Sequence, residues 1–193
     1  MDHETGDKYE IKGSAIINAT GVFTNAIMKL NDTVYKKYIV PSQGIHLVFD
    51  KSFLPSDHAL MIPKTSDGRV LFAVPWHNRI VVGTTDTLIK KHSLEPIALE
   101  SEIEFVLETA QRFLAKKPTR ADVLSVYAGL RPLAAPEDEG KSTKEVSRSH
   151  KIIVSETGLI TITGGKWTTY RKISMPIIQQ HRIKRLLVIR LEV

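Results

Sequence analysis

The sequence has no cysteine among its 193 residues. This absence excludes disulfide bonds, thiolate metal ligands and cysteine nucleophiles, and it fits a reducing cytoplasm. No apolar run approaches the roughly 20 residues that a membrane-spanning helix needs. The N-terminus is polar and acidic, unlike a signal peptide. With 42% hydrophobic and 25% charged residues, the composition is typical of a soluble globular protein.

Several motifs of nucleotide-binding and hydrolytic enzymes are also missing. The chain has no G-x-G-x-x-G, so it contains no complete dinucleotide-binding βαβ unit. G-x-S-x-G, the nucleophile turn of many hydrolases, is absent as well. The seven histidines show no metal-ligand spacing on one face, and we therefore predict no metal site.

The net charge of +6 is partly concentrated in "HRIKRLLVIR" (181–190). Such an excess of positive charge is compatible with binding to nucleic acid, to a membrane surface or to an anionic small substrate. The other basic residues are scattered and do not alternate with aromatic residues, so we do not expect a nucleic-acid partner.

The hydrophobic pattern predicts an α+β fold. Residues 8–18 read as a strand and residues 22–30 as a helix. The segment 38–87 reads as antiparallel hairpins with turns at "TSDG" and "HN" and a strand end before Pro75. Residues 101–115 have helical spacing, with a capping box formed by Ser101 and Glu104 and a stop at Pro118. The segment 123–133 reads as a strand that runs into a Gly/Pro turn, and a hairpin then turns at "ETG" before a helix near residue 167.

Three places could carry chemistry. "TITGGKWTTYRK" (161–172) is not a P-loop, because Ile160 and Trp167 occupy positions that require glycine and Ser or Thr. It remains either a plain strand-to-helix turn or a helix N-terminus that binds an anion or carbonyl, with Lys166 adding a cation. Arg131 in "YAGLRPL" suits a phosphate or carboxylate, or is a surface arginine paired with an aspartate. His46 in "GIHLVF" is either a packed histidine or a proton acceptor.

Five segments together resemble one family. "INATG", "PSQGIHLVFD", "VPWHNRIVVGTTDT", "YAGLRPL" and "TGGKWTTYRK" occur in the order and spacing of FAD-dependent glycerol-3-phosphate dehydrogenases and glycerol-phosphate oxidases. These enzymes belong to the wider D-amino-acid-oxidase-like flavoprotein group. The resemblance covers about residues 8 to 172, and "GLRPL" with "GGKWTTYRK" is its most specific pair.

The resemblance implies roles for individual residues. His46, Arg131 and Lys166 resemble the catalytic residues, and Arg131, Arg148 and Lys166 resemble the residues that bind the substrate phosphate. The residues near FAD would be Thr20, Gly21, Gly164, Gly165, Lys166 and Thr168. A helix N-terminus beside the flavin pyrimidine edge would stabilise the negative charge of the reduced ring.

The implied reaction is oxidation of sn-glycerol 3-phosphate to dihydroxyacetone phosphate, with electrons passing to a quinone or to oxygen. We expect a cytoplasmic enzyme, peripheral on the inner face of the plasma membrane when it uses quinone, and the resemblance is compatible with a homo-oligomer. Two alternatives stay open: another FAD-dependent oxidoreductase of the group that acts on a 2-hydroxy acid or amine, or a non-catalytic anion-binding module.

The same resemblance suggests how the chain is organised. We expect residues 1–37 to be a late part of the FAD-binding domain and 38–126 a largely antiparallel substrate-binding sheet with the helix 101–115. Residues 127–172 would return to the FAD-binding, Rossmann-like remnants, followed by a basic tail at 173–193. Because the G-x-G-x-x-G region and a helical C-terminal domain of the family are not in this sequence, we expect poor FAD affinity and no turnover by the chain alone.

Overall fold

The computed structural model describes residues 4–8, 10, 12–32, 34, 37–90, 93–134 and 150–179. The chain divides into two compact units, which we call the split unit (Met1–Ile39 with Ala134–Val193) and the central unit (Val40–Leu133). The division differs from the predicted one at its second boundary. The sequence predicts that residues 127–133 belong with the FAD-binding residues 1–37. They lie in the central unit instead, because their strand pairs with a strand of that unit.

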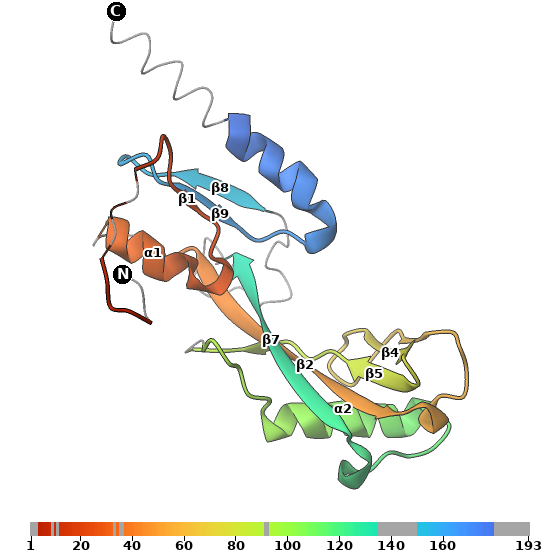
Figure 1. Cartoon of the computed structure of the whole chain (residues 1–193). Coiled ribbons are helices and arrows are strands. Elements are labelled where there is room, and N and C mark those ends of the chain that lie inside the picture. The colour runs from red at the N-terminus through yellow and green to blue at the C-terminus, as the bar shows by residue number, and fades with distance from the viewer. Residues whose placement is uncertain are drawn as a thin grey trace, which may run out of the picture. The chain divides into compact units, whose positions relative to one another are not determined.

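The split unit contains a small mixed sheet in the order β1-β9-β8 (Figure 1). Strand β1 (Ile17–Asn18) runs parallel to β9 (Ile160–Thr163), and β8 (Lys151–Val154) pairs antiparallel with β9. The short helix η1 (Gly21–Phe23) and α1 (Thr24–Asn31) follow β1. After β9 come the turn η4 (Trp167–Thr169) and helical residues 170–179.

The central unit contains a larger sheet in the order β3-β4-β5-β2-β6, and β7 also pairs with β2. Its longest strand is β2 (Ile39–Asp50), which pairs antiparallel with β5 (Arg79–Gly83) and β6 (Thr87–Leu88). Strands β3 (Leu60–Ile62) and β4 (Leu71–Trp76) extend the sheet as an antiparallel meander. The remaining elements are η2 (Lys51–Phe53), α2 (Glu100–Phe113), η3 (Arg120–Asp122) and β7 (Ser125–Ala134).

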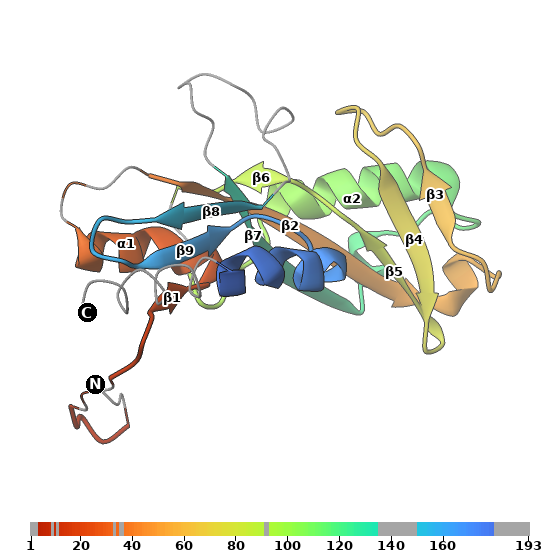
Figure 2. The same cartoon turned by 90° about the horizontal axis from the view of Figure 1, so that it is seen from above.

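Helix α2 covers one face of this sheet, and the core lies between them (Figure 2). Alternate residues of each strand point towards α2, as the period of two in a strand requires. The buried apolar cluster is built mainly from β2, β4, β5 and α2 and consists of Ile45, Leu47, Phe49, Phe53, Ile62, Leu71, Ala73, Ile80, Val82, Ile103, Val106, Leu107, Ala110 and Leu114. The opposite face of the sheet therefore stays uncovered by α2 and carries the intervening side chains.

The α+β class and the antiparallel meander are confirmed, and several local predictions are corrected. The helix predicted at 101–115 runs from Glu100 to Phe113, and its N-cap is Leu99, so the predicted capping box of Ser101 with Glu104 is wrong. Glu102 accepts a hydrogen bond from the Leu99 amide at 3.0 Å instead. The helix ends before it reaches Pro118, the predicted stop.

Both prolines that were expected to end strands lie inside strands. Pro75 is within β4, where it faces Ile80 of β5, and β3 pairs with β4 only as far as Ala73. Pro132 is within β7, so the predicted Gly/Pro turn is wrong and the strand continues to Ala134. Proline is tolerated where one side of a strand forms no hydrogen-bond ladder. The predicted strand 8–18 is confined to Ile17–Asn18 among the described residues.

Candidate functional site: an arginine–histidine pair and two glycine turns

His46 lies on the face of the central sheet that α2 does not cover. In register it stands opposite Gly83 of β5, and a Cβ added at Gly83 would come within 2.4 Å of the His46 ring. The imidazole therefore lies over the glycine, a position that any larger residue would block. On its other side the ring stacks on Tyr127 of β7, with centroids 5.1 Å apart and planes 12° apart. His46 is thus held between two strands and is only half-buried.

Arg131 reaches from β7 across to the segment that follows β5. Its guanidinium donates hydrogen bonds to the Thr85 carbonyl at 3.0 Å and to Thr84 Oγ1 at 2.9 Å. Both acceptors are neutral, so these two bonds orient the guanidinium without cancelling its charge. The group passes close to Gly44 of β2, where a Cβ would lie 2.1 Å from a guanidinium nitrogen.

The two side chains influence each other electrostatically. Burial lowers the pKa of His46 below its ordinary value, and the positive charge of Arg131 lowers it further. Both effects disfavour the imidazolium. His46 is therefore neutral at pH 7 and able to accept a proton, while Arg131 supplies a fixed positive charge nearby.

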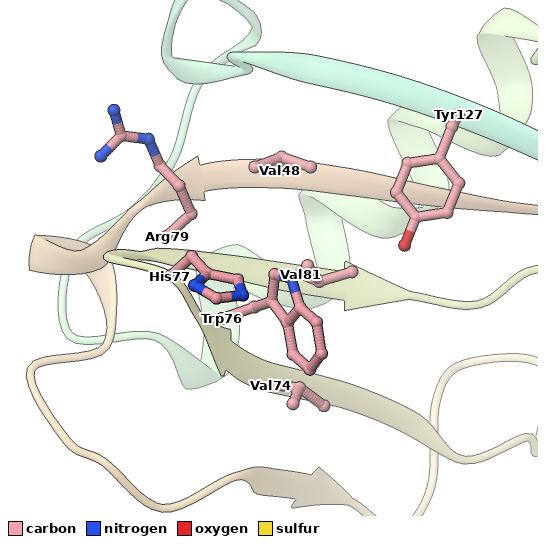
Figure 3. A pocket seen from close by; sticks show the side chains of 7 residues that line it. All are labelled: Val48, Val74, Trp76, His77, Arg79, Val81 and Tyr127. Carbon is pink, nitrogen blue, oxygen red and sulfur yellow. The ribbon is translucent and has the colours of Figure 1, made fainter.

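An apolar hollow of about 570 Å³ lies next to the stacked pair of His46 and Tyr127, because Tyr127 is one of its lining residues (Figure 3). Its floor is formed by Val48, Val74 and Val81, which come from three neighbouring strands. Tyr127 belongs both to the wall of the hollow and to the stack on His46. The remaining lining residues are Trp76, His77 and Arg79. His46 thus lies beside a surface suited to the flat or apolar part of a ligand.

The split unit contributes two glycine turns at one edge of its sheet. Because β1 and β9 run parallel and Asn18 is in register with Thr161, the chain leaves both strands at the same edge. Thr20 and Gly21 follow β1, and Gly164 and Gly165 follow β9. All three glycines have positive φ, of 59°, 74° and 85° in chain order, which favours glycine. This edge, at the carboxyl ends of parallel strands, is where open α/β sheets bind ligands.

Comparison with known proteins gives a family. The model of the FAD dependent oxidoreductase family matches residues 2–171. The chain belongs to that flavoprotein family.

The relatives of this flavoprotein chain share one name. It is 43% identical over 170 residues to the mitochondrial glycerol-3-phosphate dehydrogenase SDP6 of Arabidopsis thaliana, covering 88% of this chain and 27% of that protein. The mitochondrial glycerol-3-phosphate dehydrogenase of Homo sapiens is 39% identical over 174 residues, with 88% and 23% covered. Among solved structures, the glycerol-3-phosphate dehydrogenase of Bacillus halodurans complexed with FAD matches with a TM-score of 0.74 and 32% identity, over 86% of this chain and 31% of that one. The chain spans about a quarter of the length of the curated relatives it matches.

Two buried hydroxyls test whether the split unit fits FAD. Thr163 Oγ1 and Thr24 Oγ1 are buried and have no hydrogen-bond partner among the described residues. Thr163 directly precedes the Gly164–Gly165 turn, and Thr24 directly follows η1. A Cβ at Gly21 would meet no described atom within 4 Å, so a ligand can approach the backbone there. At Gly165, in contrast, a Cβ would lie 2.4 Å from Ile173 Cδ1, so the open glycine backbone is that of Gly21. The two unsatisfied hydroxyls and the open backbone at Gly21 fit a polar, flat cofactor.

The structure says less about the remaining predicted site residues, Lys166, Thr168 and Arg148. Lys166 and Thr168 are exposed at the start of the turn η4, which leads into the helical residues 170–179. Arg148 lies outside the described residues. His46 and Arg131 belong to the central unit, whereas the other predicted residues belong to the split unit. The structure therefore brings the predicted residues together in two groups, one in each unit.

Sequence reasoning missed several residues that build the Arg131–His46 pair. Gly44, Gly83, Thr84 and Thr85 lie within the segments that carry the resemblance, but none was assigned a role. Tyr127 begins the "YAGLRPL" segment and was likewise not singled out. Gly44 lies under the Arg131 side chain and Gly83 under the His46 ring. A glycine inside a strand often marks such a close approach, so these two glycines could have indicated the site.

Asp86 directly follows the Thr84–Thr85 segment. Its carboxylate accepts a hydrogen bond from Ser42 Oγ of β2. The described residues contain no group of three or more His, Asp or Glu side chains placed to hold a metal ion. No helix within the described ranges is both long and apolar enough to cross a bilayer.

Proposed function

We propose that this chain is part of a flavoprotein that oxidises sn-glycerol 3-phosphate to dihydroxyacetone phosphate. The single observation that carries the proposal is the fixed cation Arg131 beside the neutral, half-buried His46 in a member of the FAD-dependent oxidoreductase family. The shared name of the relatives supports the same substrate.

Arg131 would bind the phosphate of the substrate. Its guanidinium is already oriented by Thr84 and Thr85, so little side-chain entropy is lost when the anion binds. A planar fork of donors matches two phosphate oxygens. Arg148 and Lys166 remain proposals for further phosphate contacts.

His46 would take the proton of the substrate hydroxyl. The reaction removes that proton and a hydride from the adjoining carbon, and a ketone forms. Burial and the charge of Arg131 keep the imidazole neutral and able to accept the proton. The stack on Tyr127 fixes the ring plane while the proton moves.

The split unit would hold part of FAD through Thr20, Gly21, Gly164, Gly165, Lys166 and Thr168. FAD, when bound, supplies the two-electron acceptor for the hydride. The positive end of the helix that begins after Gly165 would favour negative charge at this edge.

Three further features are proposals only. The electrons would pass on to a quinone or to oxygen. The enzyme would work in the cytoplasm, peripheral on the inner face of the plasma membrane, although the relatives named above are mitochondrial. The resemblance is compatible with a homo-oligomer as the active protein.

The substrate assignment is tested by calorimetric titration of the chain with glycerol 3-phosphate and with glycerol. We expect glycerol 3-phosphate to bind, and Arg131→Met to weaken its affinity about ten- to a hundredfold, because a charge-assisted hydrogen bond contributes roughly 1.5–3 kcal/mol. The exposed Arg112→Met on α2 removes the same charge and should leave the affinity unchanged.

Glycerol lacks the phosphate and should bind far more weakly than the phosphate ester. Equal affinity for both would contradict the proposal and favour another oxidoreductase of the group. Binding of inorganic phosphate as tight as that of the ester would instead favour a non-catalytic anion-binding module.

A further inference from the structure

Glu102 is the one charged residue among the buried side chains that the structure describes, at 4% exposed. Burying a carboxylate costs several kcal/mol unless its oxygens are hydrogen-bonded. The side chain projects from the first turn of α2 into the region between the helix and β2. The hydrogen-bond partners of Glu102 show what offsets this cost.

Both carboxylate oxygens of Glu102 accept hydrogen bonds from three different segments. Oε1 accepts from Thr85 Oγ1 at 2.9 Å. Oε2 accepts from Gln43 Nε2 of β2 at 2.7 Å and from the Leu99 amide at 3.0 Å. Burial raises the pKa of Glu102, but the hydrogen bonds from Leu99, Thr87, Gln43 and Thr85 outweigh it and lower the pKa overall. Glu102 is therefore ionised at neutral pH and fully engaged.

Thr85 connects this carboxylate to Arg131. Its hydroxyl donates to Glu102 and accepts from the Ile45 amide at 3.1 Å, which fixes the residue between α2 and β2. Its carbonyl accepts from Arg131 at 3.0 Å, and the preceding Thr84 hydroxyl accepts the second Arg131 bond. Without the carboxylate, the segment that receives the guanidinium would lose its attachment to the helix.

We propose that Glu102 is a positioning residue, whose buried carboxylate fixes the guanidinium of Arg131 for the substrate anion through Thr85. This inference rests on the proposed function for the identity of the anion, but not for the chain of contacts. In this proposal α2 covers the core and, through Glu102 in its first turn, also fixes the position of Arg131.

The alternative is that Glu102 merely caps α2 and ties it to β2. That role needs only Oε2, which receives Leu99 and Gln43. Thr85→Val deletes the bond that Thr85 donates to Oε1 and also the bond that it accepts from the Ile45 amide, and it leaves the cap in place. Agreement between Thr85→Val and Glu102→Gln therefore assigns the effect to the contact between these two residues. Thr85→Ser keeps the hydroxyl and should restore the native behaviour.

The measured quantity is the pKa of His46 in the full 193-residue chain. It is obtained from the NMR shifts of the His46 ring protons as the pH is changed. The positive charge of Arg131 lowers this pKa, so displacement of the guanidinium raises it. The charged or titratable side chains described against His46 are Arg131 and Tyr127. Arg131→Met gives the value expected when that charge is gone.

We expect Glu102→Gln and Thr85→Val to raise the pKa of His46 towards its value in Arg131→Met, and Thr85→Ser to keep it at the wild-type value. Two controls on the same helix should leave it unchanged. Glu108→Gln removes an exposed carboxylate, and Thr109→Val removes a buried hydroxyl that bonds only to the Phe105 carbonyl, at 2.8 Å, among the described residues.

The proposal is overturned if Thr85→Val leaves the His46 pKa at the wild-type value while Arg131→Met raises it. It is equally overturned if Arg131→Met has no effect, because the guanidinium is then not near the ring. If Glu102→Gln fails to fold, the comparison of Thr85→Val with Thr85→Ser still decides whether the Thr85 hydroxyl, which joins Glu102 to the segment that binds Arg131, positions the guanidinium. Adding glycerol 3-phosphate to the same samples tests the proposed function separately: absence of shifts at Arg131 would refute that substrate and leave the positioning role intact.

Discussion

Gly44 shows how strongly the binding site depends on a missing side chain. A Cβ at this position would lie 2.1 Å from a guanidinium nitrogen of Arg131, the flexible end of a long side chain. The arginine can move away at little cost to the fold, but it then loses Thr84 and Thr85 as partners. Gly44 therefore matters for the position of Arg131 more than for stability.

We predict that Gly44→Ala weakens glycerol 3-phosphate binding about tenfold or more, close to the effect of Arg131→Met, with little change in the melting temperature. Gly129→Ala on β7 is the matched control, because its Cβ would meet no described atom within 4 Å. Calorimetric titration and thermal unfolding of both variants check the prediction. If Gly44→Ala bound glycerol 3-phosphate as tightly as the wild type, binding would not require the guanidinium of Arg131 to lie against Gly44 of β2.

At the scale of elements, the alternation along β3 separates core from surface within two residues. Ile62 is 0% exposed and belongs to the core beneath α2, whereas its neighbour Met61 is 58% exposed on the opposite face. Met61 stands opposite Phe72 of β4, which is exposed as well. The same alternation places His46 and Val48 on the uncovered face and Ile45, Leu47 and Phe49 in the core.

We predict that Ile62→Ala lowers the free energy of unfolding by about 2–5 kcal/mol, because it leaves a cavity in a packed core. Met61→Ala should change it by less than about 0.5 kcal/mol, since the side chain is largely exposed. Urea unfolding followed by circular dichroism measures both. A similar loss in the two variants would mean that the uncovered face is packed in solution.

At the scale of the whole molecule, the predicted site residues are divided between two units. The central unit carries Arg131 and His46, and the split unit carries the glycine turns suited to FAD. The 193-residue sequence contains no G-x-G-x-x-G turn to receive the pyrophosphate of the cofactor. We therefore expect this chain to bind the substrate anion more readily than FAD.

We predict that the purified chain retains little FAD through gel filtration and does not reduce an added artificial electron acceptor with glycerol 3-phosphate. The absence of the pyrophosphate turn is the physical reason. Absorbance at the flavin bands and a dye-reduction assay provide the measurement. A yellow protein that bleaches when glycerol 3-phosphate is added under nitrogen would contradict this prediction and strengthen the proposed reaction.

Features that depend on neighbouring residues could be predicted before the structure was known. Alternating apolar residues predicted the meander, and "HN" predicted the turn at His77 and Asn78, where φ is 44° and 59°. The helical spacing of the segment that became α2 was sufficient to find it within two residues at each end. The ordered motifs were sufficient to identify the flavoprotein family, because five short segments in register rarely coincide by chance.

Which of these residues contact one another could be learned only from the folded structure. Arg131 bonds to Thr85 across 46 positions of the chain, and Glu102 bonds to Gln43 across 59. Glu102 is flanked in sequence by residues of an ordinary amphipathic helix, so nothing local distinguishes it from the exposed Glu104. Glu102 is buried against Gln43 and Thr85, which are far from it in the sequence, and long-range packing of this kind leaves no periodic signal.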